Sequence, residues 1–161
     1  DPRAGDDEIQ GALVMARGAS PAAPADVIGR ILERRVIIAS RWGTPAETLA
    51  RVDELAAGTG ALTKGGWAGR VETWRAHAQW LAGRSQEAVA LAEASRKAID
   101  DRDYPGRLLL AQNRLVCALA ARTAGQDALA DAAAKEADAL IAGMEHPPAR
   151  LLELVAARKH S

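Results

Sequence analysis

The sequence predicts an all-α protein, a solenoid or superhelix of about three to four antiparallel helix hairpins. Two observations lead to this prediction. Ala is very abundant, Phe is absent and β-branched residues are few, and Ala has the highest helix propensity of all residues. In addition, a helix–turn–helix pattern recurs with a period of about forty residues. Because one hairpin cannot bury its apolar face alone, such a period favours hairpins that stack on one another.

Three tight turns define the repeat, and an Ala-rich amphipathic run follows each of them. The turns contain Gly43, Gly83 and Gly125, which lie 40 and 42 residues apart. We expect each glycine to adopt the left-handed conformation that commonly ends a helix. Looser loops are predicted at 58–66, 100–106 and 143–148. The helical runs predicted before the three turns are Ala25–Arg41, Trp67–Ala82 and Gly106–Thr123.

The helices after the turns begin with capping signals. Ser85 and Asp127 are predicted N-caps, and Pro45 suits the first turn of its helix, where a missing N–H costs nothing. About eight helices are expected in one domain, residues 1–161, with units at about 25–58, 66–102 and 105–143 and flanking helices at 7–17 and 148–159. Because the chain opens with Asp1 rather than Met, we expect it to be a fragment of a longer protein.

Charge and cysteine content argue against several classes of function. Lys plus Arg and Asp plus Glu number 21 each, so nothing favours direct nucleic-acid binding by this segment or attraction to a membrane surface. No apolar run reaches the roughly 18 residues of a membrane span. Cys117 is the only cysteine, which favours a reducing, cytoplasmic setting. With one Cys and three His, we expect no metal site, and we expect no cofactor.

The helix predicted at 67–82 carries two stripes of side chains, because residues three or four apart share a helix face. One stripe is predicted to be core: Trp67, Val71, Trp74, Ala78 and Leu81. The other is predicted to be a recognition strip: Arg70, Thr73, His77, Trp80 and Arg84. Trp and Arg are enriched at binding hot spots, and Arg122 of the next unit would extend the strip into a groove. The alternative is that Trp80 packs on the neighbouring hairpin while both Arg side chains are solvated.

Three other polar features have simpler explanations than catalysis. Asp100–Tyr104 is predicted to be a loop rather than a metal site, because Asp and Pro are ordinary turn residues. Cys117 lies in an apolar helical run and is predicted to pack rather than to react. The basic run Glu33–Arg35, with Arg30 and Arg41, is either a solvated face or a docking patch for an acidic partner. No Ser-His-Asp arrangement can be assembled by spacing.

The stretch GRSQEA, Gly83–Ala88, resembles the middle of a tetratricopeptide repeat. In its longer period and its Ala-, Arg- and Leu-rich character, the region of about 25–143 is similar to the helical repeats of the large ATP-dependent LuxR-family transcription activators of the maltose-activator type. This resemblance implies a parent with an ATPase module before the superhelix and a DNA-binding helix-turn-helix after it. The chain has no phosphate-loop motif, so it would be the sensor or interaction segment alone.

Taken with the resemblance, the residues predict a binding module of a larger transcriptional regulator rather than an enzyme. Its groove would bind a protein or peptide, or a small effector, and the ligand would favour one curvature or docking arrangement. Two alternatives stay open: a free-standing adaptor or scaffold that forms a homo-oligomer, and a small all-α enzyme with a site around His77 and Arg84. An enzyme should show a deep pocket with a buried titratable pair, whereas a module should show an open concave strip.

Overall fold

A computed structural model describes residues 2–19, 23–60 and 66–159 of the chain. These residues form eight α-helices and no β-strand. In chain order the helices are α1 (Pro2–Gly18), α2 (Ala25–Trp42), α3 (Pro45–Thr59), α4 (Trp67–Leu81), α5 (Ser85–Arg96), α6 (Tyr104–Thr123), α7 (Asp127–Ala142) and α8 (Ala149–Lys159). The all-α prediction is therefore confirmed. The prediction is wrong for the start of α1, which lies at Pro2 rather than at residue 7, and for the start of α6, which takes Tyr104 and Pro105 from the predicted loop. The predicted loop at 58–66 lies mostly outside the described residues, and its first two residues, Gly58 and Thr59, belong to α3.

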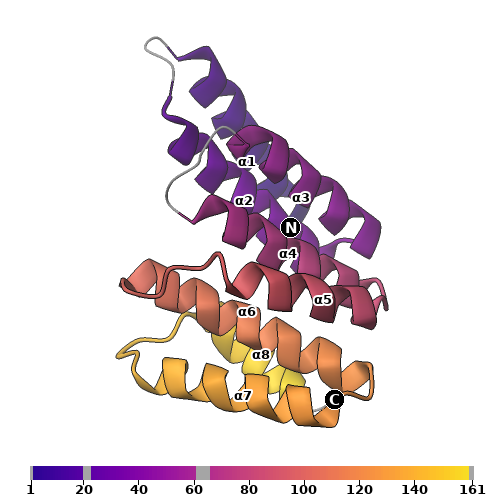
Figure 1. Ribbon diagram of the computed structural model, residues 1–161. Coiled ribbons are helices and arrows are strands. Elements are labelled where there is room, and N and C mark those ends of the chain that lie inside the picture. The colour runs from indigo at the N-terminus through magenta and orange to yellow at the C-terminus, as the bar shows by residue number, and fades with distance from the viewer. Residues whose placement is uncertain (1, 20–22, 61–65, 160–161) are drawn as a thin grey trace.

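The helices pair into three successive hairpins, α2 with α3, α4 with α5, and α6 with α7. Each hairpin packs on the next, so that the chain proceeds from α1 at one end of the stack to α7 at the other (Figure 1). The backbones of the first helices contact one another, α2 with α4 and α4 with α6. Among the described residues, the backbones of the second helices α3, α5 and α7 make no such contact with one another.

Two of the three corners share one backbone conformation. Gly83 and Gly125 have φ of 76° and 72°, the left-handed conformation that was predicted and that costs glycine little. The next residues, Arg84 and Gln126, have nearly the same angles, φ −92°, ψ 61° and φ −97°, ψ 62°. The prediction is wrong for Gly43, whose φ of −97° and ψ of −174° are extended. The repeat is thus visible in the backbone at two corners, and the first corner is built differently.

The helix starts also differ from the predicted caps. Ser85 and Asp127 are the first residues of α5 and α7, and the N-cap residues before them make no side-chain capping bond. At α3 the predicted Pro45 is indeed the first residue, and the capping is done by Thr44. Its hydroxyl accepts from the backbone N–H of Glu47 at 3.2 Å, and the Glu47 carboxylate accepts from the N–H of Thr44 at 2.6 Å. This reciprocal pair is a capping box.

Replacing Thr44 by Ala is expected to lower the free energy of unfolding by about 1 kcal/mol, because one backbone donor at the start of α3 loses its acceptor. The matched control is Ser85→Ala at the equivalent corner of the next hairpin. The Ser85 hydroxyl is buried and has no hydrogen-bond partner among the described residues, so its removal should not lower stability. Urea denaturation of both variants measures the difference, and an equal loss in both would contradict the assignment of the caps.

The apolar interior runs through the whole stack in adjoining clusters. One cluster joins α1 to α4 and includes the predicted core residues Trp67, Val71, Trp74 and Ala78, all of which are buried. Another joins α4 to α8 around α6, whose residues 109–121 are buried throughout. The fifth residue of the predicted stripe, Leu81, is only partly buried. The helix α6 is thus the central element of the second half of the stack.

Two buried arginines connect neighbouring helices. Arg35 of α2 donates to Asp6 of α1 and to Glu54 of α3, each at 2.9 Å, and this pairing fastens α1 to the first hairpin. Arg114 of α6 is 2% exposed and lies between Glu93 of α5 and Glu136 of α7. In both cases two carboxylates compensate one buried guanidinium.

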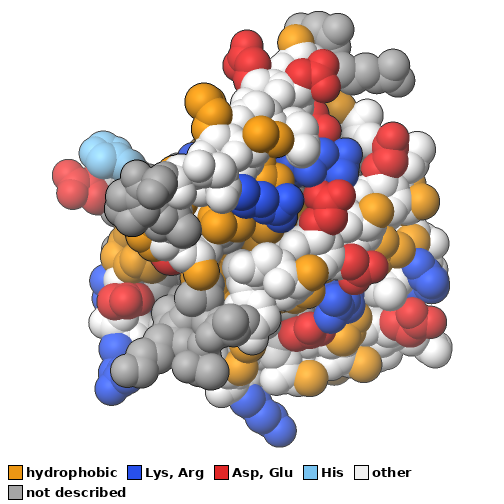
Figure 2. All heavy atoms as spheres, turned by 90° about the horizontal axis from the view of Figure 1, so that it is seen from above, with side chains coloured by type: hydrophobic (Ala, Val, Ile, Leu, Met, Phe, Trp, Pro, Cys, Tyr) orange, Lys and Arg blue, Asp and Glu red, His pale blue; other side chains and the backbone are white. Residues whose placement is uncertain are grey.

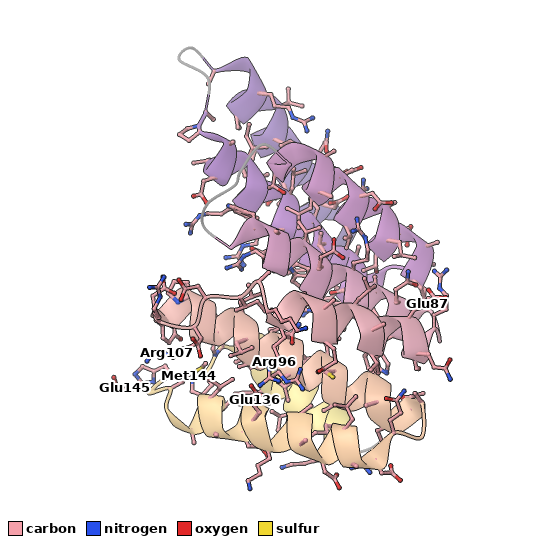
Figure 3. The ribbon with its side chains drawn as sticks, in the orientation of Figure 1. Glu87, Arg96, Arg107, Glu136, Met144 and Glu145 are labelled. Carbon is pink, nitrogen blue, oxygen red and sulfur yellow. The ribbon has the colours of Figure 1, made fainter. Side chains whose placement is uncertain are left out.

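Ion pairs also link side chains at the surface of the stack. Arg96 of α5 and Glu136 of α7 point toward one another across α6 (Figure 3), and Arg96 Nη2 donates to the Glu136 carboxylate at 2.7 Å. On the face that Figure 2 shows, Lys and Arg side chains alternate with Asp and Glu side chains, and apolar side chains lie between them. The charge balance of the sequence is therefore also a local balance on this face.

Candidate functional site

The most distinctive cluster of polar and aromatic groups surrounds His77 of α4. His77 is buried, with 4% of its surface exposed. Its ring stacks on Trp80 at a centroid distance of 5.7 Å and meets Trp74 edge-on at 5.9 Å. These residues belong to what we call the first-helix face, the surface of α2, α4 and α6 against which α8 lies, and which includes Ser40, Trp74 and His77.

Arg150, in the first turn of α8, lies directly on this cluster. Its guanidinium sits over the Trp74 ring, 4.0 Å from the ring centroid. Its Nη1 donates to the Ser40 hydroxyl at 3.4 Å, and its Nη2 is 3.3 Å from His77 Nδ1. Its Nε is buried and has no hydrogen-bond partner among the described residues. Because an arginine has donors only, His77 Nδ1 must accept, which fixes His77 as the neutral tautomer with its proton on Nε2.

Burial and charge act on both groups in the same direction. Burial, and then the positive charge of Arg150, lower the pKa of His77 to about 3, so the imidazole is neutral at pH 7. Burial, and then the charge of Arg41, lower the pKa of Arg150 to about 10, although Glu153 and Glu33 oppose this shift. Arg150 therefore stays charged at pH 7, and it forms no ion pair with any described carboxylate.

The helix α8 reaches all three hairpins from this position. Glu153 accepts from Arg41 of α2 through both carboxylate oxygens, with Nε 3.1 Å from Oε2. Arg158 donates to Asp138 of α7 at 2.9 Å, and Leu151 and Leu154 are buried in the cluster around α6. In Figure 1, α8 lies behind α6. The first-helix face, where the sequence predicts an open strip, is thus covered in part by the chain's own last helix.

Of the predicted strip residues the structure brings together His77 and Trp80, whereas Thr73 is fully buried and its hydroxyl accepts from Asn113 of α6 at 3.3 Å. Trp80 is half-buried, and its Nε1 donates to the Thr123 hydroxyl of α6 at 3.3 Å. It also packs against apolar residues of the next hairpin. For Trp80 the structure therefore agrees with the alternative interpretation, in which this side chain packs on the neighbouring hairpin.

The two arginines of the predicted strip, and Arg122 that was predicted to extend it, make no contact with His77 among the described residues. Arg70 donates to Glu33 of α2 at 3.0 Å and is not solvated in the way that the alternative supposed. Arg84 is exposed at the corner before α5. Arg122 pairs with two aspartates of α7, one of them at 2.8 Å. Because Arg122 is held by its own hairpin, it does not extend a groove lined by His77.

The other polar features can now be placed. Asp100–Asp103 form the predicted loop, and Asp103 caps α6 by accepting from the N–H of Gly106 at 2.7 Å. Cys117 is buried, and burial raises the pKa of its thiol to about 11, which fits packing rather than reactivity. In the described part of the chain, no group of three or more His, Cys, Asp or Glu side chains is arranged to hold a metal ion.

The basic run of α2 divides into arginines engaged by other helices and arginines at the surface, among them the exposed Arg34. Arg35 is buried between two carboxylates, and Arg41 is engaged by Glu153 of α8. Arg30 is exposed and pairs with Asp26 on its own helix at 3.0 Å. Of these arginines, Arg35 and Arg41 join α2 to other helices, and the solvated-face interpretation fits Arg30 and Arg34.

Two hollows lie away from His77. One, of about 360 Å³, lies between α1, α2 and α3 and is lined by Leu13, Arg17 and Arg35 among others. The other, of about 230 Å³, is lined by Arg70, Ile99 and residues that precede or begin α6. Neither is lined by His77 or Arg150, so the buried titratable pair and the hollows are separate features.

Sequence reasoning identified His77 but missed the residues through which α8 contacts this face. Arg150, Ser40 and Glu153 were not singled out, and their contacts join positions 73 to 112 residues apart in the chain. The one signal available was the amphipathic pattern of residues 148–159 after two prolines. That pattern predicts a helix but does not say which surface it covers.

Comparison with known proteins gives no match among family models, curated proteins or solved structures. Among the described residues, no helix combines the length and the apolar character needed to cross a bilayer. The arguments about function therefore depend on the contacts of this chain itself.

Proposed function

We propose that this chain is a TPR-like helical-repeat module that binds a protein or peptide on its first-helix face. The observation that carries the proposal is α8, a helix that already lies on this face and touches all three hairpins through side chains of Arg150, Glu153 and Arg158. A surface that accommodates one amphipathic helix of its own chain has the shape and chemistry to accommodate another. Helix-in-surface docking is a common mode of peptide recognition.

The packing of the hairpins supports a curved, superhelical arrangement. The backbones of α2, α4 and α6 contact one another, whereas those of α3, α5 and α7 do not within the described residues. The row of first helices is therefore the tighter side of the stack, which in a curved solenoid is the inner side. Trp74, His77 and Arg41 on that side supply the aromatic and cationic groups that are common at binding hot spots.

As the setting of this module we propose a larger regulatory protein in a reducing, cytoplasmic compartment. The resemblance of the forty-residue period and of GRSQEA, Gly83–Ala88, to the helical repeats of ATP-dependent LuxR-family activators supports a transcriptional regulator. The single, buried Cys117 supports the compartment, because no intrachain disulfide is needed for the fold.

A binding role is also better supported than a catalytic one. A general base works best when its pKa lies near the working pH, and the pKa of His77 is lowered to about 3 by burial and by Arg150. In addition, the Nδ1 lone pair of His77 is already engaged by the Arg150 guanidinium. His77 is thus arranged as a structural acceptor in a helix–helix contact.

Site-specific photo-crosslinking in the parent organism tests the proposed face. A benzophenone amino acid at Trp42, an exposed aromatic residue beside Arg41 at the end of α2, is expected to form a discrete adduct with one partner, whose crosslinked segment mass spectrometry then maps. The matched control is the same amino acid at Lys135, an exposed position of α7, which should give no adduct above background. Equal adducts from both positions, or none from Trp42, would contradict the proposal.

A further inference from the structure

The helix α8 is attached to the stack through few buried side chains, and α7, the last helix of the hairpins, resembles it in this respect. Among the described helices, its backbone comes close to that of α6 alone, and only Leu151 and Leu154 of its residues are buried. By comparison, all of residues 109–121 of α6 are buried. Segments with few buried apolar contacts open at lower free energy than the core does. With so few buried side chains, α8 is an element that can leave while α6 remains folded.

The environment of Arg150 indicates the same weakness. The chain buries Arg35 and Arg114 by giving each of them two carboxylates. Arg150 pairs with none: its guanidinium lies over the Trp74 ring, its Nη groups contact a hydroxyl and an imidazole, and its buried Nε contacts no acceptor among the described residues. Removing a cation from water without a paired anion is costly. The docked position of α8 therefore carries an electrostatic cost that the hairpins do not share.

We propose that α8 is an internal occupant of the first-helix face, and that the external partner is an amphipathic helix with the same Arg-Leu-x-x-Leu-x-x-x-Arg face, which displaces α8 in order to bind. This inference deepens the proposed function and rests on it. Glu153 adds its pair with Arg41, and beside it Arg150, Leu151, Leu154 and Arg158 contact the stack from one side of α8. Their spacing of one, four and eight residues keeps them on one side of a helix. The exposed Leu152 and Lys159 lie outside this pattern.

The loop between α7 and α8 favours the binding of α8 over that of a free peptide. The loop at 143–148 joins the two helices, and a short linker gives the tethered helix an effective concentration in the millimolar range. A free peptide at micromolar concentration therefore competes poorly with an intact α8. A change that weakens α8 without altering the face should release the site and strengthen peptide binding.

The test uses the full chain and a fluorescent peptide with the sequence of residues 147–159. Leu151→Asp places a charge on the buried side of α8 and leaves every residue of α2, α4 and α6 unchanged. Leu152→Asp makes the same chemical change on the exposed side. By fluorescence anisotropy, the Leu151→Asp protein is expected to bind the peptide at least about ten-fold more tightly than the wild-type and Leu152→Asp proteins. A peptide that itself carries Leu151→Asp should not bind any of them.

Hydrogen exchange tests the same inference on the wild-type chain, without any substitution. If α8 undocks alone, its amides should exchange at least about 100-fold faster than those of α6. Equal protection of α8 and α6 would show that α8 opens only with the whole protein, and would overturn the inference. Failure of the peptide to bind Leu151→Asp would overturn it as well. If the Trp42 crosslink still captures a partner in that case, the proposed function survives; if it does not, both fail.

Discussion

Replacing Arg114 by Ala is expected to lower the free energy of unfolding by about 3–5 kcal/mol, the usual cost of breaking a buried ion pair from one side. Arg114 is 2% exposed, and its Nε lies 3.0 Å from the Glu136 carboxylate while its Nη1 contacts that of Glu93. Its removal takes the arginine from Glu93, leaves Glu136 with Arg96 alone, and opens a cavity at the junction of α5, α6 and α7. Urea denaturation followed by circular dichroism measures the loss.

Arg122 is a closely matched control, because it is also an arginine of α6 that contacts two carboxylates. Its partners Asp127 and Asp131 are exposed, however, and exposed ion pairs contribute little to stability. The Arg122→Ala variant should keep the urea midpoint of the wild type. Arg114→Met, which retains the apolar stem, should fall between the two. Similar losses for Arg114→Ala and Arg122→Ala would show that burial does not decide the energetics of these pairs.

The helices and their pairing could be predicted from the sequence because local signals determine them. Ala-rich amphipathic runs gave the helices, and Gly83 and Gly125 gave two corners with φ of 76° and 72°. At the first corner a local conflict was overlooked. Pro45 forces the residue before it into extended backbone, and Thr44 has φ −84° and ψ 161° accordingly. The chain turns there through Thr44, so Gly43 has no need of a left-handed conformation.

The candidate site was only half predictable, because its other half is brought in by tertiary packing. The helical stripe of α4 identified His77 and Trp80, which the structure stacks at 5.7 Å. The placement of Arg150 depends on which surface α8 covers, and no local pattern specifies that. For Arg122 the local sequence did contain the relevant signal. Its partners Asp127 and Asp131 lie only five and nine residues further along the chain.

Lowering the pH from 7 to 5 is expected to remove about 2 kcal/mol of stability through His77 alone. The pKa of His77 is lowered from 6.5 to about 3 by burial and by Arg150, so the folded protein binds fewer protons than the unfolded chain between these values. The contribution of His77 to the free energy of unfolding is therefore fully present above about pH 6.5 and is lost as the pH falls toward 3. The charged groups that bear on this contact are Arg150 and Arg41, opposed by Glu33 and Glu153.

The window between pH 5 and 7 isolates this effect from the carboxylates. The pKa values of Asp6, Asp26 and Glu93 are lowered from 3.8 or 4.5, so their contributions to stability are lost only at lower pH. In His77→Gln the side-chain amide oxygen can still accept from Arg150, but nothing titrates. We therefore expect urea midpoints that fall between pH 7 and 5 for the wild type and stay level for His77→Gln. A wild-type midpoint that does not change would mean that His77 is already exposed to solvent, because a buried neutral imidazole beside a guanidinium cannot bind a proton without loss of the contact.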